Sequence, residues 1–211
     1  MRVIDITRPL EGTAPWPGER GLERTLTKTH ARDGWETSEL ALCSHLGTHV
    51  DAPAHLFPDG KRLGQLSLDP FVGPALVVDC GDARVIGAEV IPTDGVEPGD
   101  RVLLRTANSA RRGGGFYEDF CYPGVDAVRL LVERGISLLG VDGPSVDGYG
   151  KEPAVHRLLF EKNIPALEGL DLSGAAPGRY TLVCLPLRID SAEGAPCRAV
   201  LLEGERDTRP V

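Results

Sequence analysis

The stretch Ser44–Phe57, SHLGTHVDAPAHLF, concentrates the chemistry of the chain and constrains its local fold. Three of the five histidines of the protein fall within eleven residues here. With Asp51 they form the pattern H-x3-H-x-D-x3-H, which runs from His45 through His49 to His55. Neutral imidazole and carboxylate are ligands that zinc and its first-row neighbours accept. The segment is therefore a candidate metal site, and the spacing of its ligands predicts its conformation.

The spacing excludes two regular structures for the whole segment. On an α-helix, the first two histidines would share one face, while the aspartate and the last histidine would lie nearly opposite. On a straight strand, the first two histidines would be about 13 Å apart, too far for one ion. A tight turn at residues 47–48 followed by extended chain removes both problems. His49 and Asp51 then project to the same side, and Pro53 keeps the preceding residue extended.

Two other interpretations of the cluster are weaker. The histidines could be scattered surface residues, with Ser44, Thr48 and Asp51 acting only as caps, but chance rarely gathers so scarce a residue. The site could instead be a closed, structural metal site. Structural zinc sites are usually rich in cysteine, whereas sets of histidine and carboxylate tend to keep a position open for water. The ligand set therefore favours chemistry over a purely structural role.

The cysteines are consistent with this choice. Their count is odd, they are widely spaced, and no CxxC pair occurs, so we expect neither a disulfide framework nor a cysteine-based zinc site. Reduced and mostly buried thiols are expected instead. The five cysteines are Cys43, Cys80, Cys121, Cys184 and Cys197.

Strand-like runs recur at short intervals along the chain. Several are continuously apolar, as in strands that are buried on both faces. Helical patterns are fewer: Val125–Glu133 stops at Gly135, and Ala154–Lys162 follows Pro153, which suits a first helical turn. Ala107–Gly115 is expected to be an exposed, mobile loop. The strand-like runs are Arg2–Ile6, Gly73–Asp79, Arg101–Thr106, Ile136–Val141, Tyr180–Leu185 and Arg198–Leu202.

The composition fits one globular domain over residues 1–211, of the mixed α/β (α+β) class with more strand than helix. Hydrophobic residues make up 41% and charged residues 26%, which excludes fibrous and disordered classes. The net charge is −8 with no basic stripe, so we expect no nucleic-acid partner. No run approaches the roughly 18 apolar residues of a membrane span. Because MRVIDITRPLEG is not a signal peptide, we expect a cytoplasmic protein without a membrane partner.

Several polar residues further along the chain cannot be assigned from spacing alone. His156 lies in a predicted helix, where a lone histidine is more often structural than a ligand. Glu168 has no motif around it. Asp142, Ser145 and Asp147 follow a predicted strand, where their side chains could simply tie a turn.

The string HLGTHVDAPAH, from His45 to His55, resembles the signature of the metal-dependent cyclase family, the group that contains bacterial kynurenine formamidase and isatin hydrolase. The resemblance covers nearly the whole chain and implies a strand-rich α/β domain of the swivelling β/β/α type, usually dimeric or larger. The weaker pieces occur in the family's order. They are VIDITRPL, PWPG and GWETSEL before the core, then FVGPALVVD, LLRT, LLGVDGPSVD, LEGL and GAPCRAVLLEG after it.

Carried over residue by residue, the family pattern implies two metal ions per subunit, with zinc as the first choice and manganese as an alternative. One ion would have three protein ligands, and one of these would bridge to the second ion. The implied ligands are His45, His49 and Asp51 for the first ion, and Asp51, His156 and Glu168 for the second. His55 would be the catalytic acid/base and not a ligand.

The resemblance implies a metal-dependent amide hydrolase. A metal-bound water has a lowered pKa, so hydroxide is available at neutral pH to attack an amide carbonyl, and His55 could protonate the departing amine. The best single guess is an arylformamidase that converts N-formylkynurenine to kynurenine and formate. Trp16 of PWPG matches an aromatic residue of the formamidases and would stack on an aryl amide, unless it only packs between Pro15 and Pro17.

Two features depart from the formamidase pattern. Glu19 stands where formamidases commonly have aspartate after the WPG. A basic, glycine-rich loop follows the LLRT strand, and its Arg111 and Arg112 could meet a substrate carboxylate, although such pairs are more often only solvated.

Three alternatives remain. The substrate could be a cyclic amide such as isatin, or an acyl compound of specialised metabolism. The protein could also be a non-catalytic metal-binding protein on the same fold, but such a protein would have no need of His55. A serine hydrolase is disfavoured, because GPSVD lacks the second glycine of the G-x-S-x-G motif.

Overall fold

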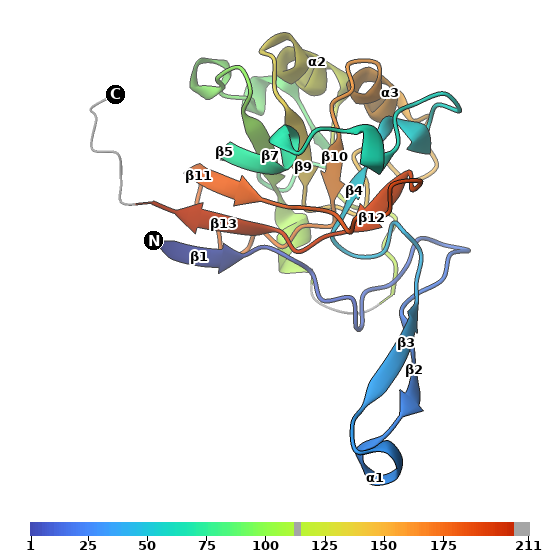
Figure 1. Ribbon diagram of the computed structural model, residues 1–211. Helices are drawn as coiled ribbons and strands as arrows, with labels where there is room; N and C mark the ends of the chain where they lie inside the picture. Colours follow the sequence, from blue (N-terminus) through green and yellow to red (C-terminus); the bar gives the residue numbers. More distant parts are fainter. Residues whose placement is uncertain (112–114, 205–211) are drawn as a thin grey trace.

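A curled sheet forms the body of the protein (Figure 1). The computed structural model describes residues 1–111 and 115–204. Within these residues, nine strands join in the order β1-β13-β11-β5-β7-β9-β10-β4-β12. Their bounds are Arg2–Asp5 (β1), His49–Asp51 (β4), Val72–Asp79 (β5), Arg101–Arg105 (β7), Leu138–Val141 (β9), Ala166–Glu168 (β10), Gly178–Val183 (β11), Gly194–Pro196 (β12) and Val200–Glu203 (β13). The predicted class, mixed α/β and rich in strands, is confirmed.

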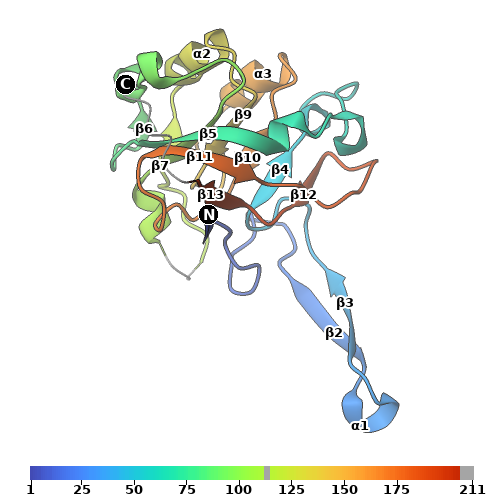
Figure 2. The same ribbon diagram turned by 60° about the vertical axis from the view of Figure 1, so that its left-hand side comes forward.

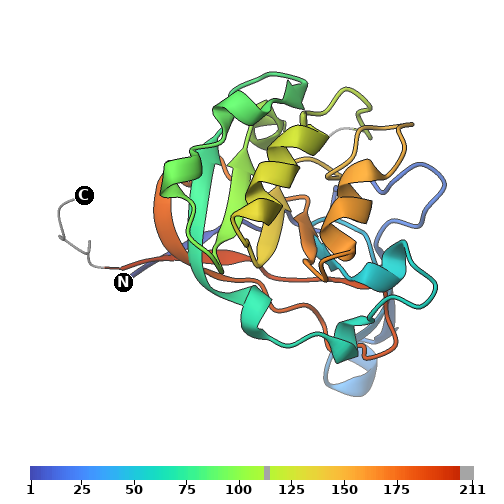
Figure 3. The ribbon, with the colours of Figure 1, turned by 90° about the horizontal axis from the view of Figure 1, so that it is seen from above.

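The centre of the sheet is parallel and its two sides are antiparallel. Strands β5, β7, β9 and β10 run parallel, whereas β1, β13 and β11 on one side and β4 and β12 on the other pair antiparallel. Helices α2 (Val125–Glu133) and α3 (Ala154–Phe160) lie together over one face of the parallel strands (Figure 3). Parallel strands covered on both faces are apolar throughout, which explains the continuous runs in the sequence.

Alternate residues of the central strands enter two different apolar clusters. On β7, Val102 and Leu104 pack with residues of α2 and α3, while Leu103 points to the opposite face. The cluster on that opposite face also holds Val50 of β4 and Leu167 of β10. The two strands that carry candidate ligands are therefore anchored in the core by the residues next to those ligands.

A long hairpin projects away from the body in both Figure 1 and Figure 2. Strands β2 (Glu23–Lys28) and β3 (Thr37–Ala41) pair antiparallel and are joined through the short helix α1 (His30–Asp33). We call residues 23–41 the arm. It exposes Leu26, Leu40 and Trp35, which are 47%, 61% and 56% exposed. The sequence analysis did not predict this arm.

Short elements complete the fold. Among the described residues, β6 (Val85–Ile86) pairs with β8 (Tyr122–Pro123). Short 3-10 helices connect the larger elements: Pro53–His55, Leu63–Gln65, Asp69–Phe71, Ala88–Val90, Thr93–Gly95 and Ala107–Ala110. No helix in residues 1–111 or 115–204 has the length and apolar character needed to cross a membrane.

The predicted loop at Ala107–Gly115 needs a correction. Its first residues form a 3-10 helix, and Asn108 and Ser109 are buried and not exposed. The reason is the buried carboxylate of Asp142, which accepts hydrogen bonds from the backbone and hydroxyl of both Thr106 and Ser109 at 2.7–3.1 Å. Asp142 thus ties a turn, the structural role that the sequence had left open for it.

Candidate metal centre

The backbone of the histidine motif has the predicted conformation. Gly47 adopts a left-handed conformation (φ 67°), which turns the chain, and residues 49–51 then form β4. Residue 52 is extended (φ −101°, ψ 161°) before Pro53. Because β4 is extended, His49 and Asp51 project to the same side, as the spacing requires.

The neighbours of β4 place further groups beside these two residues. Strand β10 pairs with β4 so that Glu168 lies opposite His49, and β12 pairs so that Gly194 lies opposite Asp51. A Cβ atom at residue 194 would be 2.8 Å from Cε1 of His45 and 3.0 Å from Oδ1 of Asp51. Only glycine therefore lets β12 approach the site this closely.

His49 is held with one nitrogen facing two carboxylates. Its Nδ1 donates to the carbonyl oxygen of Gly47 at 2.9 Å. Its Nε2 lies 3.3 Å from Oδ1 of Asp51 and 3.5 Å from Oε2 of Glu168. This Nε2 is buried and has no hydrogen-bond partner among the described residues. A nitrogen fixed in this way presents a lone pair to the site.

His156 enters the same cluster from helix α3. Its Nε2 lies 3.4 Å from Oδ2 of Asp51 and 3.2 Å from Oε1 of Glu168. Its Nδ1 lies 2.7 Å from Oδ2 of Asp147, which also accepts the backbone N–H groups of Val155 and His156. Asp147 therefore accepts two N–H groups from the first turn of α3 and also orients the imidazole of His156.

His45 and His55 lie on the open side of the cluster. Nδ1 of His45 is 2.7 Å from Oδ1 of Asp51, and its Nε2 is 3.3 Å from Oε1 of Glu193. Glu193 also accepts a hydrogen bond from Ser44 at 2.6 Å. The ring of His55 is 4.2 Å from that of His45, centroid to centroid.

The charges in the cluster depend on one another. Burial opposes ionisation of every member, but Asp51 and Glu168 raise the pKa of His49 well above its usual value. The histidines in turn keep the pKa of Asp51 well below its usual range and lower that of Glu168 to about 2, against burial and mutual repulsion. Two buried carboxylates therefore require positive charge between them. Protons on imidazole can supply it, and so can a metal cation bound by neutral imidazoles.

The donor set fits metal ions. Two groups of three side chains each bring ligand atoms within 4.8 Å of one another, and Asp51 belongs to both. A buried nitrogen without a partner and carboxylates shared between histidines are features of such a centre. The two groups are His45, Asp51 and His55, and His49, Asp51 and Glu168. The first of these groups thus includes His55, to which the family resemblance assigns proton transfer and not metal binding.

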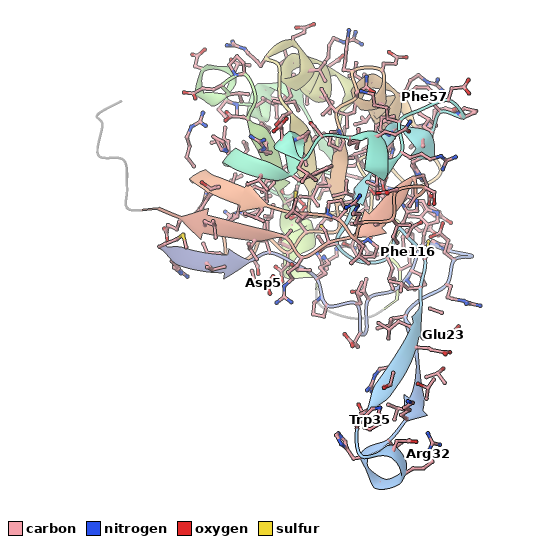
Figure 4. The ribbon with its side chains drawn as sticks, in the orientation of Figure 1. Asp5, Glu23, Arg32, Trp35, Phe57 and Phe116 are labelled. Atoms are coloured by element: carbon pink, nitrogen blue, oxygen red, sulfur yellow. The ribbon has the colours of Figure 1, made fainter. Side chains whose placement is uncertain are left out.

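A cavity of about 350 Å³ opens onto this cluster. Trp16 lines it together with Phe116, whose ring centroid is 5.0 Å from that of Trp16. Tyr149 contacts both rings at 5.4 Å. Trp16 is therefore not simply packed between prolines, because its ring belongs to an aromatic wall of the cavity. In the view of Figure 4, Phe116 lies close to the base of the arm.

The structure assembles all the predicted site residues and adds others. The five implied ligands and His55 line one cavity, with Trp16 on its wall. Sequence reasoning missed Glu193 and Phe116. Asp147 was seen, but only as a residue that could tie a turn. Glu193 lies directly before the GAPCRAVLLEG string and Phe116 directly after the glycine run, but neither has a spacing that indicates its partner.

The fold and the site define a class: a strand-rich α/β protein with a buried histidine–carboxylate centre, open to solvent through an aromatic-walled cavity. Residues 4–148 match the model of a family described as putative cyclase. The chain belongs to this cyclase family, as the histidine motif had indicated.

Relatives and solved structures align with almost the whole chain. Kynurenine formamidase of Bacillus cereus is 37% identical over 201 residues, 94% of this chain and 96% of that protein. Kynurenine formamidase of Salinibacter ruber is 39% identical over 206 residues, 95% of this chain and 97% of that protein. A potential metal-dependent hydrolase with cyclase activity superposes with a TM-score of 0.85 at 28% identity, covering 97% of this chain and 98% of its own. Isatin hydrolase A from Labrenzia aggregata shares the fold, with a TM-score of 0.84 at 24% identity over 97% of this chain and 94% of its own.

Proposed function

We propose that this protein is a metal-dependent amide hydrolase, an arylformamidase that converts N-formylkynurenine to kynurenine and formate. The observation that carries the proposal is the shared position of Asp51 between two groups of ligand atoms on the floor of an aromatic-walled cavity. The similarity to kynurenine formamidases at 37% and 39% identity supports the choice of substrate.

Two metal ions per subunit are part of the proposal, zinc first and manganese as the alternative, since both accept this donor set. Bound ions of this kind polarise a carbonyl and lower the pKa of water, which makes hydroxide available at neutral pH. The residues that would hold them are His45, His49 and Asp51 for one ion and Asp51, His156 and Glu168 for the other. The carboxylate of Asp51 lies within 3.4 Å of three imidazoles, which supports its assignment to both ions.

His55 is proposed to move the proton that the departing amine needs. It is at the cavity mouth, beside the cluster, with its ring centroid 4.2 Å from that of His45 and 5.5 Å from that of His156. Desolvation lowers the pKa of His55 against the attraction of Asp51, and the neighbouring imidazoles add to the lowering. An imidazole with a lowered pKa releases its proton readily, which suits a proton donor to a weakly basic aryl amine.

Trp16 and Phe116 are proposed to hold the aryl group. Their rings meet edge to face at an interplanar angle of 69° on the cavity wall. An aryl formamide against this wall would direct its carbonyl towards the histidine–carboxylate floor. A cavity of about 350 Å³ is within the usual size range for small-molecule sites.

A cytoplasmic homodimer or larger homo-oligomer is also part of the proposal. The arm supports the oligomer, because it exposes Leu26 and Leu40 away from its own body, and a two-stranded hairpin is marginally stable alone in water. Sedimentation equilibrium tests the state, and a monomer at micromolar concentration would contradict it.

The decisive experiment is hydrolysis of N-formylkynurenine by the purified protein before and after chelation, with metal content measured on the same sample. Rapid turnover that is lost with the metal and restored by zinc or manganese is the expected result. Bound metal without turnover would reject this substrate, and isatin and other cyclic or aryl amides would then be assayed. A protein that binds no divalent metal would contradict the hydrolase itself.

A further inference from the structure

The charged residues that line the cavity indicate which groups the substrate carries beyond its amide, an inference that rests on the proposed function. We propose that Lys151 binds a carboxylate and Glu19 binds an ammonium group, so that the preferred substrates are aryl formamides that carry an amino-acid tail. Both residues line the cavity outside the metal centre.

Arg8 lines the cavity, but most of its donors are already engaged within the protein. Its guanidinium donates to four carbonyl oxygens, at 2.8–3.2 Å, which belong to Asn108, Arg111, Asp142 and Leu170. These bonds tie together the segments that follow β7, β9 and β10. Arg8 therefore braces these segments at the cavity, with four of its five N–H donors used within the protein.

Arg111 is engaged as well. It forms a two-point ion pair with Asp119, at 2.6 and 3.0 Å, and its guanidinium lies 4.4 Å from the ring centre of Tyr117. This arrangement fixes the segment that brings Phe116 and Tyr117 to the cavity. The role of Arg111 is thus to hold the wall, and not to meet a substrate carboxylate as the sequence had allowed. Arg112 lies outside the described residues.

Lys151 is the remaining cation among the described residues that line the cavity. Its ammonium has no ion pair within residues 1–111 and 115–204, although its backbone is well anchored. The Lys151 N–H donates to Gly148 at 3.0 Å, and Gly150 adopts the left-handed conformation (φ 67°) that the turn needs. Tyr149, two residues before it along this loop, contacts Trp16 of the aromatic wall. The free ammonium is therefore carried by the loop that also supports the aryl site.

Glu19, which also lines the cavity, supplies the opposite charge. Its backbone N–H donates to the carbonyl oxygen of Trp16 at 2.9 Å in a tight turn, so the two residues are held close together along the chain. The described partner of this carboxylate is the neutral thiol of Cys43, at 2.6 Å. A thiol leaves the negative charge of Glu19 uncompensated, and a substrate ammonium can pair with it.

These positions match one substrate chemistry. An aryl ring on the Trp16–Phe116 wall, with its formamide directed to the metal centre, leaves its other substituent at the cavity mouth. A substituent that ends in both a carboxylate and an ammonium finds a cation and an anion there. Neutral aryl amides and cyclic imides have no group that uses either charge, so this mouth favours an amino-acid tail over them.

The test for Lys151 compares two substrates and three proteins. N-formylkynurenine carries the carboxylate, and N-formylkynuramine is the same molecule without it. Lys151→Met should raise the KM for N-formylkynurenine by about tenfold, the value of one charge-assisted contact, with kcat little changed. The KM for N-formylkynuramine should change by less than about twofold. Lys162→Met, which removes an exposed lysine of the chain outside the cavity, is the matched control.

Glu19→Gln provides the reciprocal arm, because glutamine can still accept the Cys43 thiol. Its KM should rise about tenfold for N-formylkynurenine and stay unchanged for the analogue that lacks only the amino group. Equal changes for the paired substrates in either variant would overturn this inference and leave the hydrolase intact. Failure of the wild-type protein to hydrolyse any of the three formanilides would overturn the proposed function and this inference together.

Discussion

His49 and Glu168 face each other across two antiparallel strands, with Nε2 of the histidine 3.5 Å from Oε2 of the glutamate. The pairing of β4 with β10 sets this relationship, since residues directly opposite in an antiparallel pair present their side chains on the same face. Val50 and Leu167, one residue away on each strand, point instead into the core. Slippage by one residue would turn the candidate ligands into the apolar core and the core residues towards the cavity, so strand register sets the geometry of the candidate metal centre.

We predict that Glu168→Gln weakens metal binding at least about 100-fold, because an amide removes one of two buried negative charges and is a poorer ligand. Competition with a chromophoric chelator measures the affinity. Glu133→Gln, at an exposed position of α2, is the control and should bind metal as the wild type does. Unchanged affinity in Glu168→Gln would remove Glu168 from the ligand set.

The second prediction separates proton transfer from metal binding. His55→Ala should retain the full metal content and lose activity by about 100-fold or more, the usual contribution of a general acid. His49→Ala should lose metal, since its Nε2 is the buried nitrogen that faces both carboxylates. Metal analysis after dialysis gives the answer. Loss of metal in His55→Ala to the same extent would make His55 a ligand, as its proximity to His45 and Asp51 also permits.

The third prediction concerns stability. Chelation should lower the melting temperature by about 10 °C, because a ligand at 1,000 times its Kd contributes about 4 kcal/mol and each kcal/mol shifts a domain of this size by about 2–4 °C. Differential scanning calorimetry with and without added zinc measures the shift. Glu168→Gln serves as the control, and an equally large response in that variant would locate the stabilising metal elsewhere.

Asp142 is predicted to be a structural residue with no part in metal binding. Asp142→Ala should lower the free energy of unfolding by about 3–5 kcal/mol, because the buried N–H groups of Thr106 and Ser109 lose their acceptor. Urea unfolding at fixed metal concentration measures the loss. Asp94→Ala, whose side chain is fully exposed, should change stability very little. A loss in Asp142→Ala no larger than in this control would mean that another group satisfies the turn.

Local features of the fold were accessible from the sequence. The turn at Gly47, the extended chain that follows it and helix α2 over Val125–Glu133 each depend on neighbours within a few residues. The long apolar strands were recognised for the same reason, with ends that differ by at most two residues. Helix α3 ends at Phe160, two residues before the predicted end.

Features that depend on distant pairing were not accessible. Strands β10 and β12 are three residues each, too short to produce a pattern, and they form by pairing with strands distant in the sequence: β10 with β4 and β9, and β12 with β4. Spacing gave no role to Glu168 or His156, and only the family resemblance implied one. Glu193 is beyond either kind of reasoning, because its contact with His45 arises where β12 crosses beside the site. The arm could not be predicted for a different reason. Its strands are mostly exposed, so they lack the alternation of apolar and polar residues that marks a half-buried sheet.

Strand pairing fixes the ligands on β4 and β10, whereas the residues that we assign to substrate recognition lie on connecting segments: Trp16, Glu19, Phe116 and Lys151. The two sets of positions can therefore evolve separately. A gene duplicate can acquire a new substrate through insertions and substitutions in its connecting segments, while inheriting the hydrolytic centre unaltered. Enzymes for several amides can in this way share the same sheet and differ mainly in the segments that connect its strands.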